Sequence, residues 1–129
     1  MMNYLAVFLG GGFGSISRLF LSAYVGKNMN TLFPMGTLIV NLLGSFLIGF
    51  LFEIFEHTAF PQTSRNLLSI GFLGGFTTFS AYSLENSNLL RGGEYNMLAI
   101  NLFSHSVFGL FSVFLGIIAG QFLIKLFVK

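Results

Sequence analysis

The chain has 129 residues, of which 54% are hydrophobic and only 8% are charged. A soluble domain carries about 25% charged residues, and so few charges could not cover the surface of a soluble protein this small, so the bilayer must be its main solvent. A net charge of +2 on so apolar a chain argues against nucleic-acid binding, and the absence of cysteine excludes a disulfide framework and a thiolate metal site.

Four long apolar segments take up almost the whole chain. A membrane span needs about 20 predominantly apolar residues, so we expect four transmembrane helices, near residues 3–25, 33–55, 66–90 and 96–125. No segment has the features of a signal peptide, so the first helix is expected to stay in the mature protein. The connections are short. The predicted fold is therefore an all-α membrane protein with one transmembrane domain over residues 1–129.

Small residues recur at helical spacing in the first and fourth spans. Gly10 and Gly14 form a G-x-x-x-G pattern, and Gly116 and Gly120 form another. Such residues let helix backbones approach closely in lipid, where packing replaces the hydrophobic drive. Either pair could pack helices within one subunit or form a contact between subunits, and the sequence leaves both open.

Few polar side chains lie inside the first two spans. Arg18 is a charge within the first helix, which is costly unless the side chain reaches an interface or finds a partner. It could make a structural hydrogen bond, or it could attract anions. Asn41 lies near the centre of the second helix, with Thr37 one turn away on the same face. An amide at this depth serves either as a hydrogen-bonding link between helices or as part of a ligand site.

The third span is interrupted in its middle by the sequence G-G-F-T-T-F-S at residues 74–80. Backbone carbonyls at membrane depth can stay unpaired only where protein buries them or where they line a cavity or an ion site. We therefore predict a broken helix that holds a ligand. Phe79 and Tyr82 follow the interruption on a shared face, a spacing that is usually a packing pattern.

The fourth span carries a stripe of polar and small residues at steps of four, four, three and four: Asn101, His105, Gly109, Ser112 and Gly116. A polar stripe on an otherwise apolar helix indicates a wetted pathway or a close helix contact. His105 by itself makes no metal site.

The kinds of reactive side chain that the sequence lacks argue against several classes of function. No nucleophile lies beside a plausible base and no phosphate-binding loop is present, which argues against an enzyme. The acidic residues are all expected at helix ends or in loops: Glu53, Glu56, Glu85 and Glu94. A proton-coupled exporter of cations would need a buried carboxylate. Hydroxyl and amide donors with aromatic ring edges suit an anion better.

The distribution of basic residues bears on orientation. With four spans, Arg65, Lys125 and Lys129 fall on one side of the membrane, and Lys27 and Arg91 fall on the other. Positive residues favour the cytoplasmic side, so three against two is a weak bias. The chain either follows that bias or inserts both ways and pairs with an inverted copy of itself.

Three segments resemble the Fluc (CrcB-type) family of small fluoride channels, in the same order along the chain. They are G-G-G-F-G-S-I-S-R at residues 10–18, G-T-L-I-V-N-L-L-G-S-F at residues 36–46, and G-F-L-G-G-F-T-T-F-S at residues 71–80. The last is the most characteristic of the family, and the resemblance extends along essentially the whole chain.

The resemblance implies an antiparallel homodimer with dual topology and two fluoride pores. It also implies a sodium ion at the dimer centre, held by the backbone carbonyls of Gly74 and Thr77 from each subunit. The implied activity is passive export of cytoplasmic fluoride across the plasma (inner) membrane. The implied partners are a second copy of the chain, fluoride and the lipid bilayer.

The resemblance also implies an anion pathway, which maps onto Asn41, Phe79, Tyr82, Thr37, His105, Ser112 and Arg18. Tyr82 stands where the family usually has phenylalanine. One and two turns beyond His105 the family usually has hydroxyls, whereas this chain has Gly109 and Val113, with Ser112 as the nearest substitute. The pathway is therefore less polar at that end or shifted in register.

Three other functions stay open at this stage. The chain could be one subunit of a heterodimeric fluoride channel, because some relatives work as pairs of distinct chains. It could be a dual-topology small multidrug transporter, which the lack of a mid-span carboxylate disfavours. It could also be a membrane partner that transports nothing, but such a protein would have no need of a broken third helix.

Overall fold

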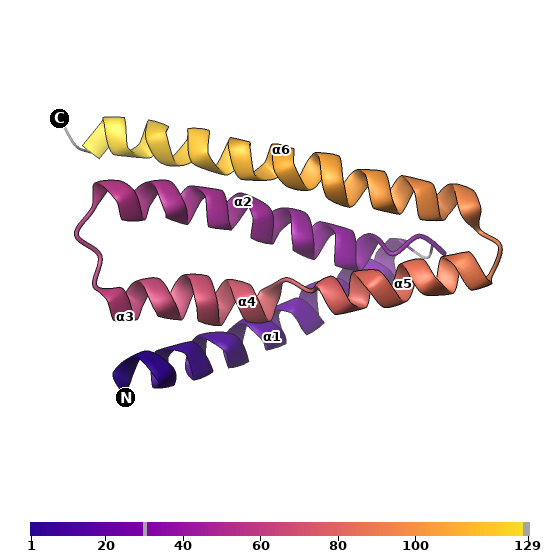
Figure 1. Ribbon diagram of the computed structural model, residues 1–129, viewed down its shortest axis with the longest axis horizontal. Helices are drawn as coiled ribbons and strands as arrows, with labels where there is room; N and C mark the ends of the chain where they lie inside the picture. The colour runs from indigo at the N-terminus through magenta and orange to yellow at the C-terminus, as the bar shows by residue number, and fades with distance from the viewer. Residues whose placement is uncertain (30, 128–129) are drawn as a thin grey trace.

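The computed structural model describes residues 1–29 and 31–127. It contains four helical segments that are long and apolar enough to cross a membrane: Met2–Met29, Met35–His57, Gln62–Arg91 and Tyr95–Phe127. The segments run alternately in opposite directions, so the N-terminus, the end of the last helix and the connection between the second and third segments lie at one end (Figure 1). This confirms the prediction of four spans.

The third span begins earlier than expected and is built from four pieces. They are α3 (Gln62–Arg65), η1 (Asn66–Leu73), α4 (Gly74–Phe76) and α5 (Phe79–Arg91). The piece η1 is a π-helix, a wider helix with i→i+5 hydrogen bonds that is frequent at functional sites. Between α4 and α5 the backbone of Thr77 and Thr78 is extended, with ψ angles of 159° and 115°. The predicted break in the third helix is confirmed at these two residues.

The helix α1 (Met2–Met29) packs on the first half of the third span. A Cβ atom at Gly10 would collide with the backbone oxygen of Leu67, and one at Gly14 would collide with that of Phe72. Glycine is required here because the two backbones touch. The first G-x-x-x-G pattern therefore packs helices within one subunit.

The helix α2 (Met35–His57) packs along α6 (Tyr95–Phe127), as the two upper ribbons of Figure 1 show. A Cβ atom at Gly116 would collide with the backbone oxygen of Phe46, and one at Gly120 would crowd the side chain of Glu53. The second G-x-x-x-G pattern thus also serves packing within the subunit.

The second half of the third span has a different partner from the first half. Whereas η1 and α4 lie against α1, α5 lies against α6. The third span therefore changes its neighbour at the break.

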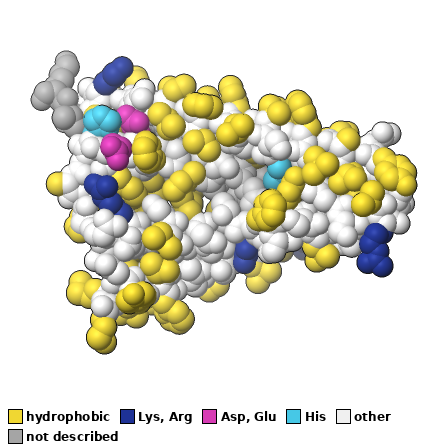
Figure 2. Space-filling model, in the orientation of Figure 1, with side chains coloured by type: hydrophobic (Ala, Val, Ile, Leu, Met, Phe, Trp, Pro, Cys, Tyr) yellow, Lys and Arg dark blue, Asp and Glu magenta, His cyan; other side chains and the backbone are white. Residues whose placement is uncertain are grey.

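Most large hydrophobic side chains are exposed, as expected for helices that face lipid. Figure 2 shows them along the whole visible face, with most charged side chains near its two ends. Among the described residues only two large side chains are completely buried, Val40 and Asn101. The core of the described chain is therefore thin, and one of its two fully buried large side chains is polar.

The connection between α2 and α3 is held by Arg65. Its guanidinium donates hydrogen bonds to the backbone carbonyls of Phe55, Thr58 and Phe60, and it lies 5.3 Å from the centre of the Phe55 ring. A cation at the C-terminus of a helix bonds the carbonyls that the helix leaves unpaired. Arg65 therefore caps α2.

Candidate functional site

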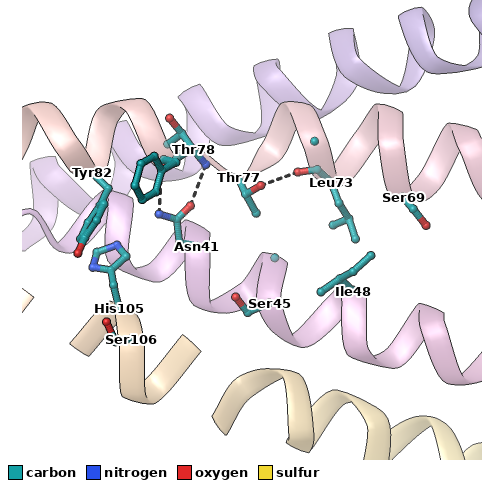
Figure 3. A pocket seen from close by; sticks show the side chains of 13 residues that line it. Asn41, Ser45, Ile48, Ser69, Leu73, Thr77, Thr78, Tyr82, His105 and Ser106 are labelled. Carbon is teal, nitrogen blue, oxygen red and sulfur yellow. Dashed lines mark hydrogen bonds between the residues drawn. The ribbon is translucent and has the colours of Figure 1, made fainter. Parts of the chain in front are cut away.

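A cavity of about 540 Å³ opens beside the break, between α2, the third span and α6 (Figure 3). Its polar lining comes from all three segments: Asn41, Ser45, Ser69, Thr77, Thr78, Tyr82, His105 and Ser106. Among the described residues, no Asp or Glu belongs to the lining. The cavity is therefore rich in hydroxyl and amide groups and free of acidic ones.

Asn41 binds both backbone polar groups of Thr78. Its Oδ1 accepts a hydrogen bond from the Thr78 N–H at 2.9 Å, and its Nδ2 donates to the Thr78 carbonyl at 3.1 Å (Figure 3). In a continuous α-helix the Thr78 N–H would bond the carbonyl of Gly74, four residues earlier. The side chain of Asn41 therefore replaces one rung of the helix and frees the Gly74 carbonyl.

The side chain of Thr78 frees a second carbonyl. Its Oγ1 accepts a hydrogen bond from the Ala81 N–H at 3.2 Å and so caps the start of α5. In a continuous helix that N–H would bond the carbonyl of Thr77. The carbonyls of Gly74 and Thr77 are those that the family resemblance implies as sodium ligands. The space beside Gly74 is open, because a Cβ atom there would meet nothing within 4 Å.

Arg18 reaches the break from α1. Its Nη1 donates a hydrogen bond to the freed Thr77 carbonyl at 3.3 Å. Of the two roles considered for Arg18, the structural hydrogen bond is therefore present. Arg18 also lines a second cavity, of about 690 Å³, together with Thr37 and Glu85.

An aromatic group borders the first cavity. The ring centre of Tyr82 lies 5.6 Å from that of Phe79 and 4.3 Å from that of His105. Phe79 is 79% exposed, while His105 is half-buried. Figure 3 shows the Tyr82 and His105 rings side by side at the cavity. The structure thus brings together three of the residues that the sequence assigned to the anion pathway.

The orientation of the His105 ring is fixed by the main chain of its own helix. Its Nδ1 lies 3.1 Å from the carbonyl oxygen of Asn101. A carbonyl can only accept, so Nδ1 carries the hydrogen. The other ring nitrogen, Nε2, is buried and has no hydrogen-bond partner among the described residues.

Thr37 lies away from the first cavity and is paired with an acid. It is buried, and its hydroxyl donates a hydrogen bond of 2.5 Å to Oε1 of Glu85. The second carboxylate oxygen, Oε2, is buried without a partner among the described residues. Glu85 lies inside α5, six residues before its end. The expectation that all four acids lie at helix ends or in loops is therefore wrong for Glu85.

Helical spacing in the sequence does not indicate where Glu85 points. Tyr82 and Glu85 lie three residues apart on α5, yet Tyr82 borders the first cavity and Glu85 contacts Thr37 at the second.

The polar residues of α6 divide between two environments. His105 and Ser106 line the cavity, whereas Ser112 is not among its lining residues. Asn101 is buried and donates a hydrogen bond to Asn86 of α5 at 2.8 Å. The hydroxyls near the break that the sequence reading missed come from Ser45, Ser69 and Ser106.

The chain is similar to known proteins over almost its whole length. Residues 5–117 match the family described as CrcB-like protein, Camphor Resistance (CrcB). The chain is 41% identical over 126 residues to a protein of Parabacteroides distasonis, which covers 98% of each chain. It is 45% identical to proteins of Aquifex aeolicus and Thermus thermophilus, over 90% of this chain and 94% and 93% of theirs. All three relatives bear the name fluoride-specific ion channel FluC.

Proposed function

The chain belongs to the CrcB-like protein family, and on this premise we propose that it is a fluoride-specific channel. It would let cytoplasmic fluoride leave passively through the plasma (inner) membrane. Hydrogen fluoride enters a cell as a neutral weak acid and dissociates inside, so a pore for the anion relieves its accumulation. The structural observation that carries the proposal is the broken third span, at which Asn41 replaces a helix hydrogen bond beside an acid-free polar cavity.

The chemistry of that cavity suits a small, partly dehydrated anion. Hydroxyl groups donate hydrogen bonds, and aromatic ring edges carry the positive end of the ring quadrupole. In the proposed pathway the anion passes Phe79, Tyr82 and His105 on one side and Asn41 on the other. Arg18 and Thr37 lie at the second cavity, where Arg18 would attract the anion. Ser112 continues the pathway further along α6.

We further propose a sodium ion at the carbonyls of Gly74 and Thr77. Hard monovalent and divalent cations prefer oxygen ligands, and both carbonyls have lost their helix partners to the side chains of Asn41 and Thr78. Two carbonyls per subunit make too small a set, so a second subunit would complete it. The guanidinium of Arg18 uses one lone pair of the Thr77 carbonyl, which leaves the other free.

The proposed assembly is an antiparallel homodimer formed by dual-topology insertion. Support comes from the nearly balanced basic residues and from Phe79, whose ring is 79% exposed at the edge of the cavity. A second subunit would cover that ring. Pairing with a distinct but related chain is the alternative assembly. A small multidrug transporter and an enzyme are both disfavoured by the family membership.

Fluoride release from liposomes that contain only this purified chain tests the proposal. We expect rapid fluoride efflux and no chloride efflux, with protein-free liposomes as the control. Equal release of both ions would contradict fluoride selectivity. An absence of fluoride release would contradict the homodimeric channel, and restoration by a second related chain would favour the heterodimer.

A further inference from the structure

Two side-chain contacts link α5 to α6 one helical turn apart. In the first, the rings of Tyr82 and His105 lie with their centres 4.3 Å apart. In the second, Nδ2 of Asn101 donates a hydrogen bond of 2.8 Å to Oδ1 of Asn86. Asn86 follows Tyr82 by four residues, and Asn101 precedes His105 by four. The two contacts therefore lie one above the other between the same two helices. We call the Tyr82–His105 contact the ring rung and the Asn86–Asn101 hydrogen bond the amide rung.

The amide rung is buried. Asn101 is 0% exposed and Asn86 is 9% exposed. It is the only side-chain hydrogen bond between α5 and α6 in the described part of the chain. A buried amide that loses its partner carries the full cost of desolvation. The Oδ1 atom of Asn101 is buried without a partner among the described residues, so the bond from Nδ2 to Asn86 is the one polar side-chain contact that the described structure gives this amide, and it links α5 to α6.

The backbone of Asn101 also contacts His105, which belongs to the ring rung. Its backbone carbonyl accepts the hydrogen bond from Nδ1 of His105, so it holds the imidazole ring in one orientation. Through its side chain, Asn101 holds the helix that carries Tyr82. The carbonyl would be present with any residue at position 101, so only the side-chain hydrogen bond to Asn86 depends on the asparagine.

We propose that Asn86 and Asn101 are positioning residues of the anion pathway, which set the separation of Tyr82 and His105. The inference rests on the proposed channel function and assigns a role to two residues that do not line the cavity. The pair acts through the two rings, and fluoride touches neither amide.

A double leucine variant, Asn86→Leu with Asn101→Leu, tests the proposal. Leucine has nearly the shape of asparagine, and replacing both partners of a buried hydrogen bond by apolar groups leaves no unpaired group. We expect the variant to assemble like the parent protein on gel filtration. Its fluoride efflux from liposomes should fall about three- to tenfold, the scale of one hydrogen bond. Ser104→Ala, at another buried polar position of α6, is the matched control and should conduct like the parent.

A second measurement separates positioning from general packing. Residues that act through one another show non-additive effects in a double-mutant cycle. In a His105→Ala background the ring rung is already lost, so the double leucine change should cause little further loss of fluoride efflux. A packing defect elsewhere would reduce efflux by the same factor in both backgrounds.

Three results would overturn the inference. The double leucine variant could conduct like the parent, its effect could be unchanged in the His105→Ala background, or it could fail to assemble, which would assign the pair to folding alone. Failure of the channel proposal looks different, because the parent protein itself would then release no fluoride.

Discussion

Asn41 holds Thr78 by both the N–H and the carbonyl of its backbone, at 2.9 Å and 3.1 Å. A side-chain amide carries a donating NH2 group and an accepting oxygen side by side. It can therefore hydrogen-bond both the backbone N–H and the backbone carbonyl of one residue where a helix is interrupted. The break in the third span depends on this contact from α2.

Replacing Asn41 should destabilise the fold as well as the pathway. In Asn41→Leu the Thr78 N–H and carbonyl lose their partners, and each buried unpaired group costs about 1–3 kcal/mol. We expect a lower temperature for loss of the assembled protein on gel filtration, and loss of fluoride efflux. Asn28→Leu removes an exposed amide that donates a hydrogen bond to the Tyr24 carbonyl of its own helix, and it should leave both properties unchanged. Equal stability of the two variants would contradict the role of Asn41.

The two aromatic residues after the break should differ in importance. Tyr82→Phe removes only the phenol oxygen and keeps the ring beside His105. Since one hydrogen bond is worth about 0.5–1.5 kcal/mol, we expect fluoride efflux within about tenfold of the parent. Phe79→Ile removes a ring edge altogether and should reduce efflux much more. Unimpaired efflux by Phe79→Ile would show that this face of α5 does not border the pathway.

The Thr37–Glu85 hydrogen bond should contribute to stability. Thr37→Val would leave both carboxylate oxygens of Glu85 without a partner among the described residues. The expected loss is about 1–3 kcal/mol, because the acid is partly buried. Thr37→Ser keeps the hydroxyl and should restore stability in a thermal gel-filtration assay. As a control, Thr31→Val at an exposed position should have no effect; a similar loss there would refute the argument.

Sodium should stabilise the assembled protein if the freed carbonyls bind it. A ligand that binds only the folded assembly raises its apparent stability with concentration. We expect the melting temperature of the purified protein to rise when sodium chloride replaces N-methylglucamine chloride at constant ionic strength. In Thr78→Val the Ala81 N–H loses its Oγ1 partner and is free to return to the Thr77 carbonyl, so the sodium effect should shrink. A melting temperature independent of the cation would argue against the site.

Orientation should respond to a small change in charge. Replacing Glu94, just before α6, and Asn96, in the first turn of α6, by lysine adds two positive residues at this end of the helix and spares Gly93, whose φ of 76° favours glycine. This change turns three basic residues against two into three against four, so the preferred orientation should reverse. Accessibility of a terminal tag in whole cells measures it, with the double glutamine variant as the control. A single orientation in the parent would refute dual topology.

The sequence predicted the parts of the fold that depend on local composition. Four apolar runs of sufficient length indicated four spans, and G-G-F-T-T at residues 74–78 indicated the break, because both signals lie within one segment. The importance of Asn41 was also recognisable, since an amide at mid-membrane needs a partner.

The parts that depend on how helices face one another were not predictable. Whether Gly10 and Gly116 pack within or between subunits depends on the neighbour, and each packs within the subunit here. The side of α6 that faces the cavity is set by its contact with α2, so Ser106 lines the cavity and Ser112 does not. The position of Glu85 was predicted wrongly, because the carboxylate is stabilised inside the structure by a hydrogen bond from Thr37, which lies on another helix.

The change of neighbour at the break divides the subunit into two packing modules. Substitutions in η1 and α4 change the packing against α1, and substitutions in α5 change the packing against α6. The hydrogen bonds of Asn41 to Thr78 lie between the two halves. Each half of the third span is therefore free to accumulate compensating changes with its own neighbour. Homologous chains of this family should accordingly tolerate exchange of residues 79–91 more readily when the residues of α6 that face them are exchanged as well.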